Sequence, residues 1–314
     1  MLVSVALVVA GLILLVVAGE LLVRGAVNLS LRLGIPALIV GLTVVAFGTS
    51  APEMIVSVAA VLGDAPGLAL GNVVGSNIAN ILLVLGIPAL ISAIRTDEHD
   101  LRKSWAIMVA ASVLFIALAF AGPFTWWHAL ILLGGLGLMV WDQIRDALAH
   151  RSAAREAEAA VEGADGHMSP MMIAALLIGG LIGLPVGAQL LVNGATDIAR
   201  ALGISETVIG LTLVAVGTSL PELMTSVMAA LRGRADVALG NVVGSNIFNL
   251  LGIIGVAGLV GNLPVPPELL RLDLWVMLGT ALLIGPFLWR GWPIGRALGA
   301  GLVALYAAYV WVLI

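Results

Sequence analysis

Long apolar runs separated by short polar stretches dominate the hydrophobic pattern of the chain. A helix that crosses a bilayer takes about 20 apolar residues. The runs do not resemble the short alternating segments of an outer-membrane barrel. The pattern therefore predicts an all-α integral membrane protein with ten transmembrane helices, at residues 3–22, 36–62, 67–92, 104–121, 125–144, 171–197, 204–231, 237–261, 273–289 and 295–313.

Composition supports the membrane interpretation and narrows the chemistry. The chain is 61% hydrophobic and 10% charged, whereas a soluble domain has about 25% charged residues. There is no cysteine, which excludes disulfide, iron–sulfur and thiolate chemistry. The four histidines fall at predicted span ends or in loops, which disfavours a zinc or copper site. No motif of an enzyme is found, no cofactor is expected, and the lipid bilayer is the expected partner.

The placement of basic residues predicts the orientation of the spans. Of 14 lysines and arginines, all except Arg200 and Arg271 fall on one side of a ten-span arrangement. By the positive-inside rule, both termini lie outside and the 146–169 linker is cytoplasmic. The first apolar run has no basic segment before it and exceeds signal-peptide length, so we expect a span. The linker is too short for a soluble domain, which favours a prokaryotic plasma membrane.

A carboxylate-bearing motif occurs twice. Residues 48–53 read GTSAPE, and residues 217–222, which begin 169 positions later (217 minus 48), read GTSLPE. A glutamate within a span is costly and usually functional. Because five spans, an odd number, separate the copies, the second copy enters the membrane inverted. We therefore expect two inverted five-helix repeats, 1–145 and 170–314, with ion sites between them near the midplane.

Residues next to each glutamate favour cation binding. Pro52 lacks an N–H, so carbonyls near Ala46–Gly48 are predicted to lose helical partners. Thr49 and Glu53 are four residues apart and share a helix face, with Ser50 adjacent. Hydroxyls of this kind also bond back to their own helix. Beside a proline and a glutamate, in two copies, the ligand interpretation is favoured.

A second block, GNVVGSNIAN at 71–80, recurs at 240–249 as GNVVGSNIFN. Gly71 and Gly75 form a GxxxG step, which predicts close approach of another helix. For the carboxamides of the block, interhelical hydrogen bonding and cation binding are left as equal alternatives at Asn72, Asn77, Asn241 and Asn246. Cation binding is favoured at Ser76, Asn80, Ser245 and Asn249.

Two carboxylates, hydroxyls, carboxamides and freed carbonyls make an all-oxygen site. Ca²⁺ takes about six to eight oxygen ligands, and two glutamates neutralise its charge. Without Ca²⁺, Na⁺ ions or protons can balance the same charges. Exclusion between these cations is what an antiporter requires.

The doubled motifs resemble the paired alpha repeats of the sodium/calcium exchanger family, prokaryotic type, within the cation/calcium antiporter superfamily. The resemblance implies electrogenic exchange of Na⁺ for Ca²⁺ by alternating access, with the first and sixth spans sliding across a fixed core. It implies Ca²⁺ binding by Glu53 and Glu222 with the backbone carbonyls of Thr49 and Thr218. It implies that Na⁺ uses the same glutamates with the carbonyls of Ala46 and Ala215 and the hydroxyls of Ser50, Ser219, Ser76 and Ser245. Asn80 and Asn249 would line the central position.

One departure from the family pattern concerns coupling. Some relatives carry Asp where this chain has Asn249, and a neutral side chain there predicts no potassium requirement. A proton- or potassium-coupled cation/Ca²⁺ antiporter is the first alternative, and a cation channel the second. Glu20 is not repeated, because its counterpart is Gln189, and a structural role is favoured for it.

Overall fold

The computed structural model describes residues 1–96, 101–149, 168–203 and 215–313. Within these ranges, eight helices are long and apolar enough to cross a membrane, and a bent pair brings the number to nine. The predicted all-α membrane fold is confirmed. The remaining predicted span, 204–231, lies partly outside the described residues.

Almost every described residue outside the short loops is helical. In the first half the helices are α1 (Leu2–Leu33), α2 (Ala37–Val40), η1 (Gly41–Val45), α3 (Ala46–Thr49), α4 (Ala51–Leu62), α5 (Pro66–Ala79), η2 (Asn80–Val84), α6 (Gly86–Ile91), α7 (Arg102–Ala121) and α8 (Trp126–Ala149). In the second half they are α10 (Pro170–Ala201), α12 (Ala215–Thr218), α13 (Leu220–Leu231), α14 (Ala235–Ile247), η4 (Phe248–Ile253), α15 (Ile254–Val260), η5 (Leu269–Asp273), α16 (Leu274–Leu283), α17 (Gly285–Arg290) and α18 (Arg296–Leu313).

Two helices run past the ends that the apolar pattern predicts. The first was expected to end at residue 22, but α1 continues to Leu33 and ends where Gly34 takes a left-handed conformation, φ 66°. Arg24 and Arg32 interrupt the apolar run without interrupting the helix. Likewise α8 reaches Ala149, so the helix extends beyond residue 145, where the first repeat was expected to end.

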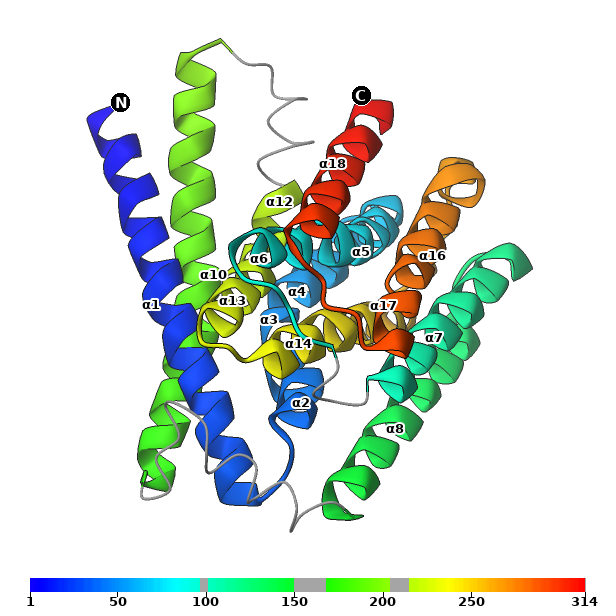
Figure 1. The fold of residues 1–314 in the computed structure, drawn as a ribbon. Coiled ribbons are helices and arrows are strands. Elements are labelled where there is room, and N and C mark those ends of the chain that lie inside the picture. The colour runs from blue at the N-terminus through cyan, green and yellow to red at the C-terminus, as the bar shows by residue number, and fades with distance from the viewer. Residues whose placement is uncertain (97–100, 150–167, 204–214, 314) are drawn as a thin grey trace.

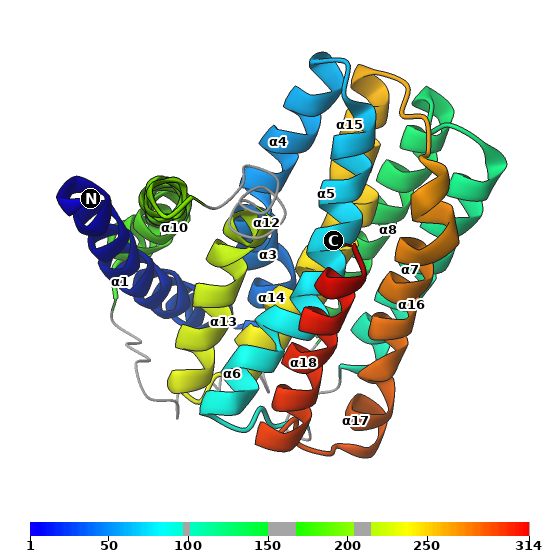
Figure 2. The same ribbon diagram turned by 90° about the horizontal axis from the view of Figure 1, so that it is seen from above.

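Helices α1 and α10 lie side by side as a long pair at one edge of the molecule (Figure 1). Seen from above, α7, α8 and α16 lie at the opposite edge, with α3, α13 and α14 between the two groups (Figure 2). The two termini lie at the same end of the molecule (Figure 1). This arrangement is the one that the predicted even number of spans requires.

Glycines bring the backbones of α1 and α10 into contact. A Cβ atom added at Gly11 would lie 2.6 Å from the Leu191 nitrogen, and one at Gly194 would lie 2.5 Å from the Ser4 carbonyl oxygen. Small residues at such crossings let helices pack without side chains between them. The pair is therefore closely joined along its length.

Three π-helical segments occur beside the repeated motifs. η1 precedes the first GTS sequence, while η2 and η4 contain Asn80 and Asn249, which are repeat counterparts. A π-helical turn widens a helix locally and changes which way its side chains point. The Asn-containing motif thus sits on irregular backbone in both halves of the chain.

Candidate functional site

Both repeated glutamates lie at a break between two helices. Ser50 interrupts the helix with φ −82° and ψ 3°, and Ser219 does so with φ −90° and ψ 3°. Pro52 falls in the first turn of α4, where a missing N–H costs no helical hydrogen bond, so the helix restarts there. The segments 37–49 and 51–62 meet at a bend of 42°. Each glutamate occupies the first turn of a new helix, where the helix dipole favours negative charge.

The two breaks meet in the middle of the fold. The Ser50 hydroxyl donates to Glu222 Oε1 at 3.1 Å, which joins one motif to the other copy. Glu53 is 1% exposed and Glu222 is not exposed at all. The Ser50–Glu222 hydrogen bond brings the two helix starts that carry these carboxylates together. Buried like charges need a compensating cation or proton.

Two carboxamides anchor the helices that carry the glutamates. Asn72 donates to the Glu53 backbone carbonyl at 3.4 Å and to the Ser57 hydroxyl at 3.1 Å. Its counterpart Asn241 donates to the same two groups of the second copy, at 3.2 Å and 3.1 Å, and accepts from the Thr49 hydroxyl at 3.2 Å. At these two positions, interhelical hydrogen bonding is the alternative that the contacts favour.

A second carboxamide pair joins α5 to α14. Asn77 and Asn246 each donate to the other's backbone carbonyl, at 3.2 Å and 3.3 Å. Asn80 also donates to Asn246 Oδ1, at 3.0 Å. The side-chain nitrogen of Asn77 also contacts the Met277 sulfur at 3.9 Å, and that of Asn246 contacts the Met108 sulfur at 3.6 Å. Sequence reasoning missed this methionine pair; its signal was that 108 and 277 differ by the repeat period.

Six predicted ligand residues present a buried oxygen without a hydrogen-bond partner among the described residues. These oxygens are Glu53 Oε2, Glu222 Oε2, Ser219 Oγ, Ser245 Oγ, Asn80 Oδ1 and Asn249 Oδ1. A buried polar atom without a partner costs free energy. Two carboxylate and four neutral oxygens are suited to hard cations such as Ca²⁺ and Na⁺.

The Ala46 carbonyl, one of the two carbonyl ligands predicted in the first motif, has hydrogen-bond partners within the protein. The Ser50 N–H donates to the Ala46 carbonyl at 3.1 Å, and the Thr49 hydroxyl donates to it at 3.3 Å. Ala46 therefore keeps the helical partner that it was expected to lose, because the break begins only at Ser50. Ser76, also predicted as a ligand, is buried in α5.

A polar cavity of about 640 Å³ leads toward the helix breaks. α10 contributes Gln189 to its wall, and Pro52, Thr218 and Pro221 come from the two motifs. Ala215, the repeat counterpart of Ala46 and also a predicted carbonyl ligand, begins α12, and Thr218 ends it. The cavity therefore lies between α10 and residues of both motifs.

The close helix approach predicted at Gly71 and Gly75 is found instead at their repeat counterparts, Gly240 and Gly244. Cβ atoms added at Gly240 and Gly244 would lie 2.8 Å and 2.5 Å from the carbonyl oxygens of Leu38 and Leu42 respectively, so α14 approaches α2 and η1 closely. At Gly71 and Gly75, no described atom outside the neighbouring backbone of the same helix lies within 4 Å of an added Cβ. The expected close approach at these two positions is therefore not made by described residues.

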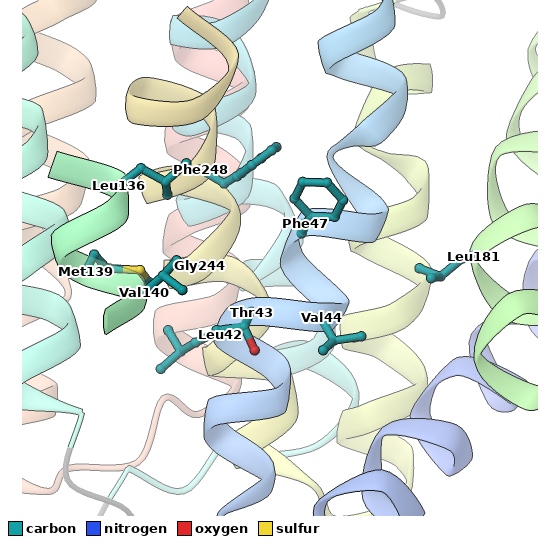
Figure 3. Close-up of a pocket in the computed structure, with 10 residues that line it drawn as sticks. All are labelled: Leu42, Thr43, Val44, Phe47, Leu136, Met139, Val140, Leu181, Gly244 and Phe248. Atoms are coloured by element: carbon teal, nitrogen blue, oxygen red, sulfur yellow. The ribbon is translucent and has the colours of Figure 1, made fainter. Parts of the chain in front are cut away.

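A separate apolar pocket of about 470 Å³ lies beside η1 and α3 (Figure 3). Phe47 and Phe248 meet edge-to-face there, with ring centroids 4.9 Å apart. The only side-chain oxygen of its lining residues belongs to Thr43, which donates to the Ile39 carbonyl at 2.6 Å. With no carboxylate in its lining, the pocket is not a cation site.

Among the described residues, no group of three or more His, Cys, Asp or Glu side chains could hold a metal ion. The buried centre instead combines two carboxylates with neutral oxygens, a composition suited to a hard cation that is bound and released. The apolar spans and the broken helices place this centre inside an integral membrane protein. These features define the class of membrane transport proteins with a buried, oxygen-lined ion site.

The chain belongs to the sodium/calcium exchanger family: the model of the sodium/calcium exchanger protein family matches residues 3–145 and 172–314. It is 35% identical to the inner membrane protein YrbG of Escherichia coli (strain K12), over 99% of this chain and 98% of that protein. It is 33% identical to the sodium/calcium exchanger MaX1 of Methanosarcina acetivorans, over 96% of each. A solved structure of the sodium-calcium exchanger NCX_Mj, soaked with zero Na⁺ and Ca²⁺, superposes with a TM-score of 0.85 at 35% identity, covering 100% of this chain and 99% of that one.

Proposed function

We propose that the chain is a secondary antiporter that exchanges Na⁺ for Ca²⁺ across the membrane, electrogenically and by alternating access. The observation that carries the proposal is the meeting of the two helix breaks, where Ser50 bonds to Glu222 and six buried oxygens lack partners in the described part of the chain. Relatives named as sodium/calcium exchangers support these ions as the substrates.

Glu53 and Glu222 are the proposed central ligands. They bind Ca²⁺ together with the backbone carbonyls of Thr49 and Thr218, and bind Na⁺ once Ca²⁺ has left. The remaining proposed Na⁺ and central ligands are Ala46 and Ala215 through their carbonyls, and Ser50, Ser219, Ser76, Ser245, Asn80 and Asn249 through their side chains. The buried orphan oxygens on six of the twelve residues support this assignment.

Exchange follows from charge compensation in a buried site. Two carboxylates in a low-dielectric centre repel one another strongly, so the site without cations is costly to enclose. Loading with Ca²⁺, or with Na⁺, removes this cost and permits the protein to change facing. After it releases one kind of ion, the site can therefore return to the first side of the membrane only when it has bound the other kind. This is the condition for coupled exchange.

The proposed topology is two inverted repeats, 1–145 and 170–314. Contacts between the repeats support it: Asn77 and Asn246, which are 169 residues apart, bond to each other reciprocally. We place both termini outside and the 146–169 linker in the cytoplasm of a prokaryote. The basic residues and the shared end of the termini support this orientation (Figure 1), and the inner membrane location in YrbG's name supports the membrane.

The test is Ca²⁺ uptake by proteoliposomes. Vesicles loaded with Na⁺ are diluted into Na⁺-free buffer, and ⁴⁵Ca²⁺ entry is followed with K⁺ present or absent, and in parallel with a proton gradient alone. We expect uptake driven by Na⁺ alone and no effect of K⁺. A membrane potential that draws positive charge out of the vesicles should accelerate uptake.

Glu53→Gln and Glu222→Gln should each abolish this uptake while the protein remains folded. Glu268→Gln, which removes an exposed carboxylate outside the site, is the matched control and should transport at the wild-type rate. Uptake that requires the proton gradient would show that protons, and not Na⁺, are the coupling ion. Wild-type rates in either site variant would refute the ligand assignment.

A further inference from the structure

An ion pair joins α1 to the end of α13. Arg232 Nε donates to Glu20 Oε2 at 3.0 Å, and Arg232 Nη2 donates to Glu20 Oε1. The Glu20 side chain is 19% exposed and that of Arg232 is 42% exposed. A two-point guanidinium–carboxylate contact fixes geometry as well as charge. The pair therefore holds α1 in one register against α13.

Close packing surrounds this ion pair. A Cβ atom added at Gly19 would lie 2.9 Å from Met228 Cγ and 3.3 Å from the Met224 carbonyl oxygen. α1 thus seals against α13 beside Glu20. The polar cavity lies elsewhere, along α10, where Gln189 lines it. One face of the α1–α10 pair is therefore closed against the core, while the other borders the cavity.

The repeat does not reproduce this ion pair on the opposite side. The counterpart of Glu20 is Gln189, and the counterpart of Arg232 is Gly63, each 169 residues away. Gln189 donates to Asn193 Oδ1 at 2.7 Å, within its own helix. Gly63 has no side chain. Among the described residues, the equivalent positions of the other repeat thus provide no such bidentate contact.

We propose that Glu20 and Arg232 are positioning residues that hold the cytoplasmic gate closed and so favour the outward-facing state. The inference rests on the alternating-access function proposed above. Because α1 and α10 contact through backbone, a shift of α10 that closes its cavity carries α1 along. That shift separates Glu20 from Arg232. Losing the ion pair therefore raises the inward-facing population.

A cysteine reporter tests this gate directly, since the chain has no native cysteine. Met228→Cys places a thiol in the closed α1–α13 interface. In inside-out membrane vesicles, its reaction with a membrane-impermeant thiol reagent is timed. We expect Glu20→Gln and Arg232→Gln each to accelerate labelling about threefold to tenfold, the range of a well-formed, partly exposed ion pair.

A double variant and two controls isolate the ion pair from general loosening. The double variant Glu20→Gln with Arg232→Gln should label no faster than either single variant, because each single change already removes the same ion pair. Arg24→Gln, which removes an exposed charge one turn further along α1, should leave labelling unchanged. Leu231→Cys, exposed at the end of α13, should label at one rate in every background and so report vesicle orientation.

Transport supplies the second readout. A smaller outward-facing fraction raises the apparent KM for external Ca²⁺ in inverse proportion to that fraction. The charge swap Glu20→Arg with Arg232→Glu should restore both values. Unchanged labelling in the two single variants, or equal acceleration by Arg24→Gln, refutes the gate. Since labelling is independent of the transported ion, failure of Na⁺/Ca²⁺ exchange with faster labelling would reject the proposed function alone.

Discussion

Replacing Asn241 with alanine should destabilise the protein more than the same change at Asn72. Both carboxamides donate two hydrogen bonds within their own copy of the motif, but Asn241 also accepts one from Thr49, and it is fully buried whereas Asn72 is only half-buried. Asn241→Ala therefore removes three contacts, including one between the two motifs. Asn72→Ala removes two, of which that to the Glu53 carbonyl is long at 3.4 Å.

Hydrogen bonds between membrane helices contribute on average about 0.6 kcal/mol each. Three such bonds give a loss of about 2 kcal/mol for Asn241→Ala, and two weaker ones give about 1 kcal/mol for Asn72→Ala. At about 2 °C per kcal/mol for a chain of this size, the melting temperatures should fall by about 4 °C and about 2 °C respectively.

The measurement is thermal unfolding of the purified protein in detergent, followed by the fluorescence of its eight tryptophans. Thr49→Ala supplies a further control. Adding it to Asn241→Ala should cost less than adding it to the wild type, since the shared hydrogen bond is already gone. Equal melting temperatures for the two asparagine variants, or a larger drop for Asn72→Ala, would refute this account of the two anchors.

Two further predictions concern packing and surface charge. Gly244→Ala should lower the free energy of unfolding by about 1–3 kcal/mol, because the new Cβ would lie 2.5 Å from the Leu42 carbonyl oxygen. The control Gly301→Ala, at a position in α18 that faces open space, should be neutral or stabilising. Melting temperatures compare the two variants. Lys103 Nζ lies 2.6 Å from the Asp146 carboxylate, but both side chains remain partly exposed. Asp146→Asn should therefore change the free energy of unfolding by less than about 1 kcal/mol. A melting shift as large as that of Gly244→Ala would contradict this.

The apolar pattern was sufficient to predict the fold class, because helices in a bilayer must satisfy their own backbone hydrogen bonds. It failed where the helix and the apolar run end at different places. α1 continues past Arg24 to Leu33, since polar residues suit a helix that projects beyond the apolar run. The π-helical turns at Asn80 and Asn249 left no trace in the pattern, since one extra residue per turn does not change the hydrophobic character of a buried segment.

For the site, the repeated motif predicted which residues gather but not how their polar groups divide between structure and ligand binding. Asn72 and Asn80 are eight residues apart, a spacing that predicts one shared helix face, yet Asn72 donates to the helix that carries Glu53. Asn80 instead donates to Asn246 and leaves its oxygen without a partner among the described residues. That division depends on residues of other helices. Spacing within one helix cannot supply it.

Two repeats in identical conformations would give identical access from both sides of the membrane, so alternating access requires the halves to differ. The described contacts contain such differences at equivalent positions. Ser50 bonds to Glu222, whereas its counterpart Ser219 has no partner for its hydroxyl among the described residues. In the proposed inverted topology the roles of the two serines exchange, so the opposite facing should pair Ser219 with Glu53 and release Ser50. The asymmetry is then a property of one facing of the protein, and the sequence symmetry is a property of the full cycle.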